Sequence, residues 1–298
     1  MRVLVDADMI AHEVGHLRHN VKDENGIDLI DEETGRAVKG DLFNPETVAQ
    51  IAVGRLFSII SGSEAGGWKA FLSRGKHYRH KLATILPYKG HREDSPRNNV
   101  DYVKEHLHQE MGAVWCSDNE ADDEMAKEQW SDIITVGSKF GYDDDILRDH
   151  TSVVIASRDK DLRTVPGWKF TWWLKGAKDE DGVEIPEEKR QVEKGKIEWI
   201  SIAQAFRNFY QQLLTGDTAD NIKGLYGVGL KSAWVKQLAD LDEEEDMYDH
   251  VEEKYFKHYG PHYGEIFLKE NAMLLHMQRR DDDQWLPPAE RDEHYWYL

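Results

Sequence analysis

The sequence has a single cysteine, Cys116, among its 298 residues. One cysteine excludes an intramolecular disulfide and any zinc site built from several cysteines, and it fits a reducing compartment. No apolar run approaches the roughly 20 residues that a membrane-spanning helix needs. The first residues, Met1 to Asp6, enter a strand-like run and lack the apolar core and cleavage site of a signal peptide. These absences predict a cytoplasmic protein with no membrane partner.

Basic residues are also scarce, with 38 Lys and Arg against 57 Asp and Glu, a net charge of -19. This balance argues at first against a polyanionic partner. The position of the charges decides binding, however, and metal ions at a carboxylate-lined site would cancel part of the acidity. We interpret the acidic run 242–246 as solvated surface. A nucleic acid is therefore not excluded as a partner.

Three common catalytic motifs are missing. The chain has no Gly-x-Ser-x-Gly of a serine hydrolase, no Gly-x-x-x-x-Gly-Lys-Ser/Thr phosphate loop, and no His-Glu-x-x-His among its 14 histidines. Nucleophilic serine catalysis and histidine-based zinc hydrolysis are accordingly poorly supported.

The order of apolar segments predicts an α/β fold. Short Val- and Ile-rich runs of the buried-strand type alternate with amphipathic helical segments. We expect strands at 2–6, 68–72, 112–116, 152–156, 169–174 and 197–200, and helices at 44–60, 96–110, from 117 and 201–214. We predict a core domain over 1–210 and a smaller helical domain over 211–298. We interpret residues 20–43 as a surface hairpin or loop and 175–196 as an exposed insertion.

Carboxylates recur where these elements end or begin. The spacing of Asp6 and Asp8, and of Asp159 and Asp161, predicts pairs on one side of a strand's carboxyl end, where open α/β sheets place their sites. Asp217 and Asp220, three apart, are expected on one face of a helix. Residues 118–124 hold five carboxylates in seven residues, more than helix capping requires. Oxygen ligands suit Mg²⁺ or Mn²⁺, and two such ions support phosphodiester hydrolysis by water.

Two further stretches suit phosphate contacts. Residues 74–97 form a basic, aromatic-interleaved segment, whose alternative interpretation is a solvated basic loop. Gly224, Gly227 and Gly229 mark a turn where backbone N–H groups can approach a phosphate, with Lys231 beside it. The predicted DNA contacts are Lys76, Arg79, Tyr88, Lys89, Arg92, Gly227, Gly229 and Lys231.

In order, the motifs are the strand ending in Asp6, Tyr88-Lys89-Gly-x-Arg92, Glu120-x-Asp122-Asp123, Asp159-Lys-Asp161-Leu, Gly216-Asp217-x-x-Asp220-Asn221-Ile and Gly227-Val-Gly229. This ordered set, over about residues 1–235, resembles the flap endonuclease and 5′ to 3′ exonuclease superfamily, particularly its free-standing bacteriophage members. The resemblance implies a PIN-like, Rossmann-like twisted sheet with helices on both faces and a helix-hairpin-helix subdomain at about 217–238.

The resemblance also implies roles for the residues. Two Mg²⁺ or Mn²⁺ ions would be held by carboxylates, and a K⁺ ion would lie at the hairpin. Lys89 would steady the scissile phosphate beneath an arch at about 75–100, and Tyr88 would stack on a terminal nucleotide. The implied metal ligands are Asp6, Glu120, Asp122, Asp123, Asp159, Asp161, Asp217 and Asp220. With Lys89 and Arg92 they form the implied catalytic set.

Two positions depart from the family pattern. Many relatives carry an Asp after the second strand, where this chain has Ser73-Arg74, and we take Asp8 as a candidate replacement ligand. The usual hairpin Pro is replaced by Lys223.

The resulting prediction is a metal-dependent nuclease acting at DNA 5′ ends in phage DNA replication or degradation, in the cytoplasm of the host. Flap cleavage and cleavage of RNA in RNA/DNA hybrids belong to the same prediction. The alternatives are a PIN-type ribonuclease and a non-catalytic, structure-specific DNA-binding protein.

Overall fold

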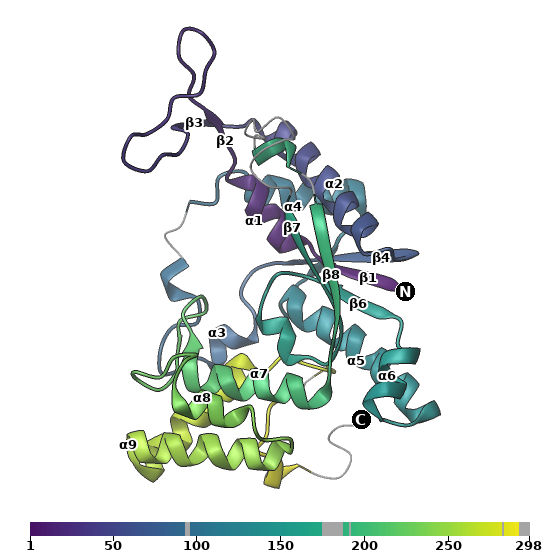
Figure 1. The fold of residues 1–298 in the computed structure, drawn as a ribbon, viewed down its shortest axis with the longest axis vertical. Helices are drawn as coiled ribbons and strands as arrows, with labels where there is room; N and C mark the ends of the chain where they lie inside the picture. Colours follow the sequence, from purple (N-terminus) through teal and green to yellow (C-terminus); the bar gives the residue numbers. More distant parts are fainter. Residues whose placement is uncertain (93–95, 175–186, 191, 282, 292–298) are drawn as a thin grey trace.

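The computed structural model describes residues 1–92, 96–174, 187–190, 192–281 and 283–291. It has a sheet-based part and a helical part, and in Figure 1 the sheet-based part lies above the helical part. The strands are β1 (Arg2–Asp6), β2 (Arg18–Asn20), β3 (Lys39–Leu42), β4 (Gly67–Ser73), β5 (Val114–Cys116), β6 (Val153–Ala156), β7 (Gly167–Leu174), β8 (Val192–Ile200), β9 (Gly216–Asp217) and β10 (Ile222–Lys223). The α-helices are α1 (Ala7–Gly15), α2 (Pro45–Gly62), α3 (Tyr78–Leu82), α4 (Val100–Met111), α5 (Ala121–Phe140), α6 (Asp144–His150), α7 (Ile202–Thr215), α8 (Ala233–Leu238) and α9 (Glu244–Leu275). Short 3-10 turns are η1 (Gly90–Arg92), η2 (Asp161–Thr164), η3 (Glu187–Lys189) and η4 (Pro288–Glu290).

Within the described residues the main sheet has six strands in the order β5-β4-β1-β6-β7-β8. All neighbours are parallel except β7 and β8, which form an antiparallel hairpin. β1 lies at the centre, and the chain order reverses on its two sides. An open parallel sheet places its ligand site outside the carboxyl ends of the strands at such a reversal.

Side chains alternate between the two faces of the central strand. Val3 and Val5 of β1 pack with α1, α2 and α4 on one face, while Leu4 packs with Met125 of α5 on the other. Helices therefore cover both faces, as the buried-strand pattern predicted. The α/β fold with a mostly parallel sheet is confirmed.

Two of the expected helix starts have the predicted caps. The Asn44 side chain accepts from Thr47 N at 2.8 Å with Pro45 next to it, and the Ser201 hydroxyl accepts from Gln204 N at 3.0 Å. The structure adds α1 directly after β1. The prediction that Asp6 and Asp8 share one side of a strand is therefore wrong, since Asp6 caps α1 and Asp8 lies in its first turn.

The helical part has its own core. Side chains of α7, α8 and α9 form it, together with Tyr88 from the segment that precedes η1. The boundary that we predicted at residues 210–211 falls inside α7, whose Phe209 already belongs to this core. The helices expected after residue 233 are present: α8 has 6 residues, and the 32 residues of α9 form two helices that meet at a kink at Gly260 (φ 77°), each longer than we expected.

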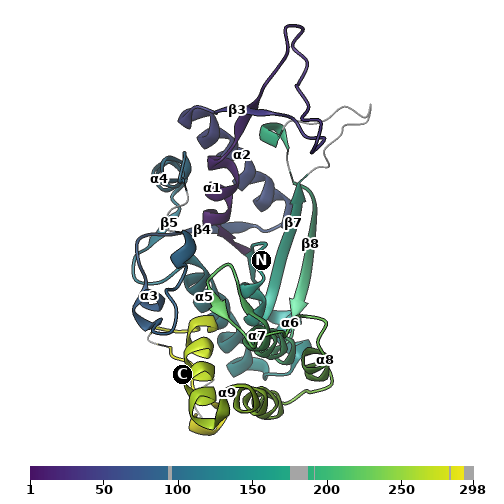
Figure 2. The same cartoon turned by 90° about the vertical axis from the view of Figure 1, so that its left-hand side faces the viewer.

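Residues 18–42 project from the sheet-based part, at the end of the molecule opposite α9 (Figure 2). β2 and β3 pair antiparallel at its base, so of the two predicted alternatives, a hairpin or a loop, the hairpin is present. Most of the predicted insertion, residues 175–186 and 191, lies outside the described residues. No helix among those described is both long and apolar enough to cross a bilayer.

Candidate active site

Carboxylates from separate segments meet at the carboxyl edge of β1 and β6. Asp6 ends β1, and Asp159 and Asp161 follow β6. The start of α5 is fixed beside them, because Ala121 N donates to the Ser73 hydroxyl at the end of β4, at 2.9 Å. The β9–β10 hairpin reaches the same edge, where Lys160 Nζ lies 2.9 Å from Asp217 Oδ2.

Asp6 is buried, and both of its oxygens accept hydrogen bonds. Oδ1 accepts from Met9 N at 3.0 Å as the cap of α1, and Oδ2 accepts from the Ser157 hydroxyl at 2.9 Å. Burial and the charge of Asp8 raise the pKa of Asp6 to about 7 despite these two hydrogen bonds. The position thus favours a bound cation or a proton at neutral pH.

Asp8 is not a free replacement ligand. Its Oδ2 accepts from Ser73 N at 2.9 Å, and its Oδ1 lies 2.7 Å from Lys104 Nζ. Asp8 therefore closes the end of β4 and is neutralised by α4. We leave it out of the ligand set proposed below.

Asp122 and Asp159 are partly exposed and face the same site. Burial, followed by the charges of Asp6 and Asp159, raises the pKa of Asp122 well above its ordinary value. Burial also raises the pKa of Asp159, with contributions from Asp220 and Asp217. Such mutual perturbation shows that carboxylates from three segments and the hairpin lie within electrostatic reach of one another.

Asp161 and Asp217 form a closely coupled pair beside Lys160. Burial, Asp159 and Asp217 raise the pKa of Asp161 to about 8. Burial opposes the ionisation of Asp217, but Lys160 lowers its pKa. Gln212 Nε2 donates to Asp161 Oδ1 at 2.5 Å and ties the pair to α7.

Lys89 lies among the predicted carboxylates. Its ammonium contacts Glu120 Oε1 and lies 3.6 Å from Asp220 Oδ1, while its backbone N donates to Asp220 O at 3.0 Å. Burial disfavours the ammonium, but the charges of Glu120 and Asp220 raise the pKa of Lys89. Asn221 Nδ2 donates to Pro87 O at 2.9 Å and fastens the same segment to the hairpin.

Tyr88 does not have the predicted stacking surface. The side chain is only 5% exposed and belongs to the core of the helical part. Its hydroxyl contacts Glu120 Oε2 at 2.8 Å and Asp220 Oδ2 at 2.6 Å. The prediction that Tyr88 stacks on a nucleotide is corrected, because its ring has no free face.

Arg79 is likewise not a DNA contact, because its side chain is 0% exposed. It donates to Asp123 through both terminal nitrogens, at 2.6 and 2.8 Å, and to Glu120 at 2.9 Å. Asp123 Oδ1 also accepts from Gln278 N at 3.0 Å. With the weaker bond from Glu120 N, the four acceptor positions of the Asp123 carboxylate are used, so we leave Asp123 out of the proposed ligand set.

Asp217 and Asp220 do not share a helical face as predicted. Gly216 has φ 73° and ends α7, and Asn221 has φ 60°, so the chain turns back as the β9–β10 hairpin. Gly224 passes so close to Gly216 that a Cβ there would lie 2.3 Å from Gly216 N. The turn is therefore built by glycine rather than by helix periodicity.

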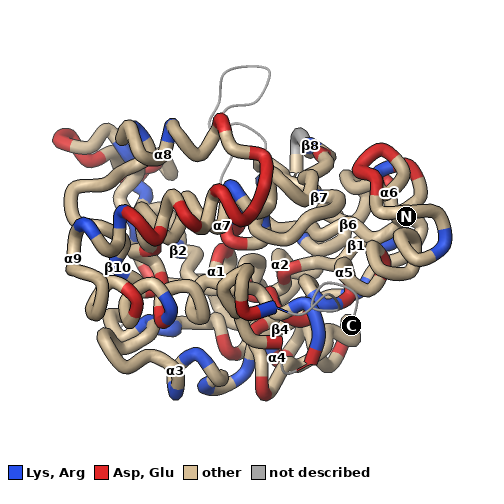
Figure 3. The backbone as a smooth tube through the Cα atoms, turned by 90° about the horizontal axis from the view of Figure 1, so that it is seen from below, with Lys and Arg blue, Asp and Glu red and all other residues tan. Residues whose placement is uncertain are grey.

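The predicted phosphate-binding turn is exposed ahead of α8. Gly227, with φ 77°, Gly229 and Lys231 all lie on the surface, as does Lys76 before α3. Lys and Arg residues lie along the chain around α3 (Figure 3). The backbone of Arg92 is in η1, but its side chain lies outside the described residues.

Sequence reasoning missed several side chains of this site. His77 Nε2 lies 3.3 Å from Glu120 Oε1, and Tyr226, next to the glycine turn, is 89% exposed. Ser157 and Lys160 stand within the same Ser-Arg-Asp-Lys-Asp run as the predicted carboxylates, so their adjacency was a usable signal. Gln212 carried no such signal, because only the packing of α7 brings it to Asp161.

The donor set fits hard divalent cations. Among the residues that the structure describes, no three side chains form a complete ligand cage for one ion as they stand. Instead the ammonium of Lys89 lies between Glu120 and Asp220, and that of Lys160 between Asp161 and Asp217. Each of these carboxylate pairs has a positive charge between its members. Carboxylate oxygens are the donors that Mg²⁺ and Mn²⁺ prefer, so such pairs suit these ions.

Comparison with solved structures gives the same fold. The chain is similar to the bacteriophage T5 D15 flap endonuclease, in a variant complexed as a pseudo-enzyme–product with DNA and metal ions. The match covers 92% of this chain and 88% of that chain, with a TM-score of 0.55 and 15% sequence identity. The chain has the flap endonuclease fold. Because the match covers 92% of this chain, it includes both the sheet-based part and the helical part of this PIN-like fold.

A second structure supports the assignment of the flap endonuclease fold. It is the bacteriophage T5 D15 protein co-crystallised with metal ions, with a TM-score of 0.52 and 14% identity over 92% of this chain and 88% of that one. No protein-family model matches the sequence, and no curated protein sequence matches it significantly.

Proposed function

We propose that the protein is a divalent-metal-dependent nuclease that hydrolyses DNA phosphodiester bonds at 5′ ends and flaps. The observation that carries the proposal is the convergence of carboxylates from β1, α5, the β6–η2 connection and the β9–β10 hairpin around two lysines. The flap endonuclease fold supports it, because the similar T5 enzyme was solved with DNA and metal ions.

Two groups of carboxylates would hold the cations. Asp6, Asp122 and Asp159 would form one group, since after burial the charges of Asp6 and Asp159 raise the pKa of Asp122 most, and Asp159 also raises that of Asp6. Asp161 and Asp217, on either side of Lys160, would form the other, together with Asp220 from the same hairpin, whose backbone N lies 3.4 Å from Asp217 Oδ1. When bound, the cations supply an activated water and charge neutralisation at the leaving oxygen.

The chain's own residues do the rest of the work. Lys89 lies between the α5 carboxylates and the hairpin, where its ammonium can donate to a scissile phosphate. Ser157 and Met9 N hold the Asp6 oxygens in place. Burial of Asp6, Asp161 and Asp217 keeps bulk water from screening the site.

DNA outside the reacting bond would be held by the glycine turn before α8. Gly227 and Gly229 leave the backbone open, and Lys231 supplies a positive charge. Exposed Lys76 completes the proposed contacts among the described side chains, and the proposal of Arg92 as a contact rests on the sequence alone. The K⁺ ion at the hairpin, the action on RNA in hybrids and the role in phage DNA metabolism belong to this proposal as its finer parts.

The test is cleavage of 5′-labelled duplex, flap, single-stranded DNA and single-stranded RNA with Mg²⁺ and then with EDTA. We expect Mg²⁺-dependent products from the 5′ ends of duplex and flap DNA and none with EDTA. Cleavage restricted to RNA would indicate a PIN-type ribonuclease. Tight flap binding without products in Mg²⁺ or Mn²⁺ would indicate a non-catalytic DNA-binding protein.

A further inference from the structure

One buried guanidinium, that of Arg79 in α3, joins its own segment to two others, the end of α9 and the start of α5. Its Nε donates to Leu274 O at the end of α9 at 2.9 Å, and Nη2 donates to His276 O at 2.6 Å. Nη1 donates to Glu120 at the start of α5, and both terminal nitrogens fork onto Asp123. Because the side chain is fully buried, all these bonds form away from water, and the planar fork fixes their directions.

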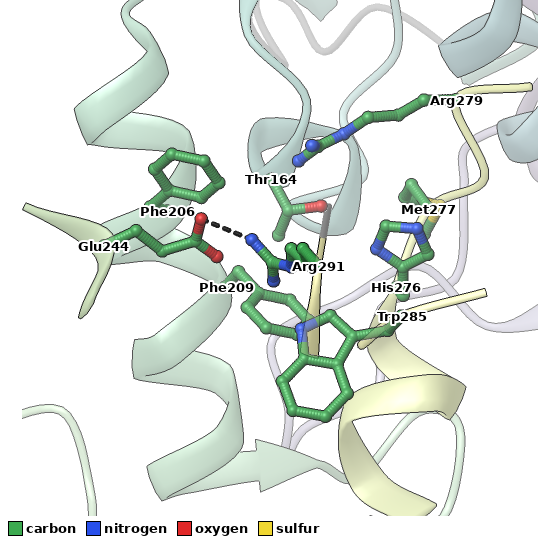
Figure 4. A pocket seen from close by; sticks show the side chains of 9 residues that line it. All are labelled: Thr164, Phe206, Phe209, Glu244, His276, Met277, Arg279, Trp285 and Arg291. Carbon is green, nitrogen blue, oxygen red and sulfur yellow. Dashed lines mark hydrogen bonds and ion pairs between the residues drawn. The ribbon is translucent and has the colours of Figure 1, made fainter. Parts of the chain in front are cut away.

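The segment after α9 is held firmly where Arg79 meets it. His276 and Met277 line a pocket with Phe209 of α7 and Trp285, in which Arg291 pairs with Glu244 at 2.6 Å (Figure 4). His276 Nε2 also contacts Asp283 Oδ2 at 2.8 Å. The carbonyls that accept from Arg79 thus belong to the end of α9 and to a following segment that packs on α7 and Trp285.

Arg79 also donates to Glu120, the carboxylate that contacts the Lys89 ammonium. Glu120 Oε2 accepts from Arg79 and from the Tyr88 hydroxyl, while Oε1 faces Lys89 and His77. A shift of the Glu120 carboxylate would therefore weaken one of the two ion pairs that hold the Lys89 ammonium.

The same contact orients α5. Glu120 and Asp123 form the capping box of α5, and Arg79 binds both of its members. Between them along the chain stands Asp122, which is left facing Asp6 and Asp159. The contacts of Arg79 thereby occupy Glu120 and Asp123 and leave Asp122 as the carboxylate of residues 120–123 that is available to the site.

We propose that Arg79 is a positioning residue for hydrolysis, which sets the places of Lys89 and Asp122 by clamping Glu120 and Asp123 to the segment after α9. This inference rests on the proposed nuclease function and extends it to a residue that touches neither substrate nor cation. A misplacement of about 1 Å by a remote change can lower a rate by about 10²-fold, and loss of a group supporting metal ligands costs about 10- to 100-fold in metal affinity or activity.

The experiment compares Arg79→Lys with Arg55→Lys. Both change a buried arginine that pairs with a glutamate and donates to a backbone carbonyl, but Arg55 contacts Glu13 and Arg190 O and none of the site carboxylates. The readouts are the urea midpoint, kcat and KM on a 5′ flap, DNA affinity in EDTA, and Mn²⁺ binding by electron paramagnetic resonance without DNA. Lysine keeps the charge of Arg79 but loses the fork.

We expect Arg79→Lys to lower kcat by about 10²-fold and Mn²⁺ affinity by about 10-fold, with KM and DNA affinity in EDTA unchanged. Arg55→Lys should lower the urea midpoint and leave kcat and Mn²⁺ affinity as they are. Equal effects of the two substitutions, or an Arg79→Lys protein with normal kcat and Mn²⁺ affinity, would overturn the positioning role.

Glu120→Gln decides the matter if Arg79→Lys does not fold. It keeps the shape of the side chain and weakens its hold on Lys89, so a fall in kcat at unchanged KM supports the role and an unchanged kcat overturns it. Wild-type protein that neither cleaves DNA nor binds Mn²⁺ would instead refute the nuclease proposal itself.

Discussion

Replacing Asp6 by asparagine separates two effects of this carboxylate: the destabilisation of the metal-free fold by its buried charge, and its contribution to cation binding and cleavage. In the folded protein the pKa of Asp6 is raised from 3.8 to about 7 by burial and by Asp8. Each unit of difference corresponds to about 1.4 kcal/mol, so an ionised Asp6 weakens the metal-free fold by about 4 kcal/mol at pH 8. An asparagine at this position would remain a good helix cap for Met9 N, at the expense of the bond from Ser157.

We therefore expect Asp6→Asn to raise the free energy of unfolding by about 3 kcal/mol at pH 8 in EDTA. The gain should be absent below about pH 3, where Asp6 carries the proton in both the folded and the unfolded wild-type protein, and should grow as pH rises to about 7. The sign follows from linkage: between these pH values the folded wild-type protein binds more protons than the unfolded one, so its stability falls as pH rises.

The assay is urea unfolding followed by tryptophan fluorescence at several pH values, with and without Mg²⁺. Wild-type protein should be stabilised by Mg²⁺ at pH 8, and the variant should gain less and should not cleave 5′-labelled DNA. Asp249→Asn, on the exposed side of α9, is the control and should change neither quantity. A variant that is less stable than wild type at pH 8, or a gain that does not vary with pH, would refute the reasoning.

Three more outcomes follow from the structure. Lys89→Ala should lower kcat by about 10²-fold and leave DNA affinity in EDTA nearly intact; a loss confined to affinity would contradict its place at the scissile phosphate. Asp283→Asn should cost about 2 kcal/mol of stability at pH 7. Burial by itself would raise the pKa of Asp283, but hydrogen bonds from His276 and Arg279 N lower it to about 2. Urea unfolding should show that loss vanishing as pH falls from about 4 through 2, and a constant loss would argue against it. Lys231→Ala should reduce the salt dependence of DNA binding by about one phosphate contact, measured by fluorescence anisotropy, and an unchanged slope would remove Lys231 from the interface.

The sequence alone determined the class of the fold. Buried strands such as 2–6 and 152–156 have a continuous apolar pattern, and caps such as Asn44-Pro45 mark helix starts by local chemistry, so both were predicted correctly. It also identified the acidic motifs, because carboxylates at strand ends are a local signal.

The tertiary structure decided which of these residues face the site. Arg79 and Tyr88 looked like DNA contacts in a basic loop, yet packing against α9 buries both and turns their donors onto Glu120 and Asp123. Neighbouring carboxylates of one stretch therefore have different partners: Asp123 is closed off and Asp122 remains available. Local patterns cannot reveal this, since the partners of these buried groups lie 32 to 195 residues away along the chain.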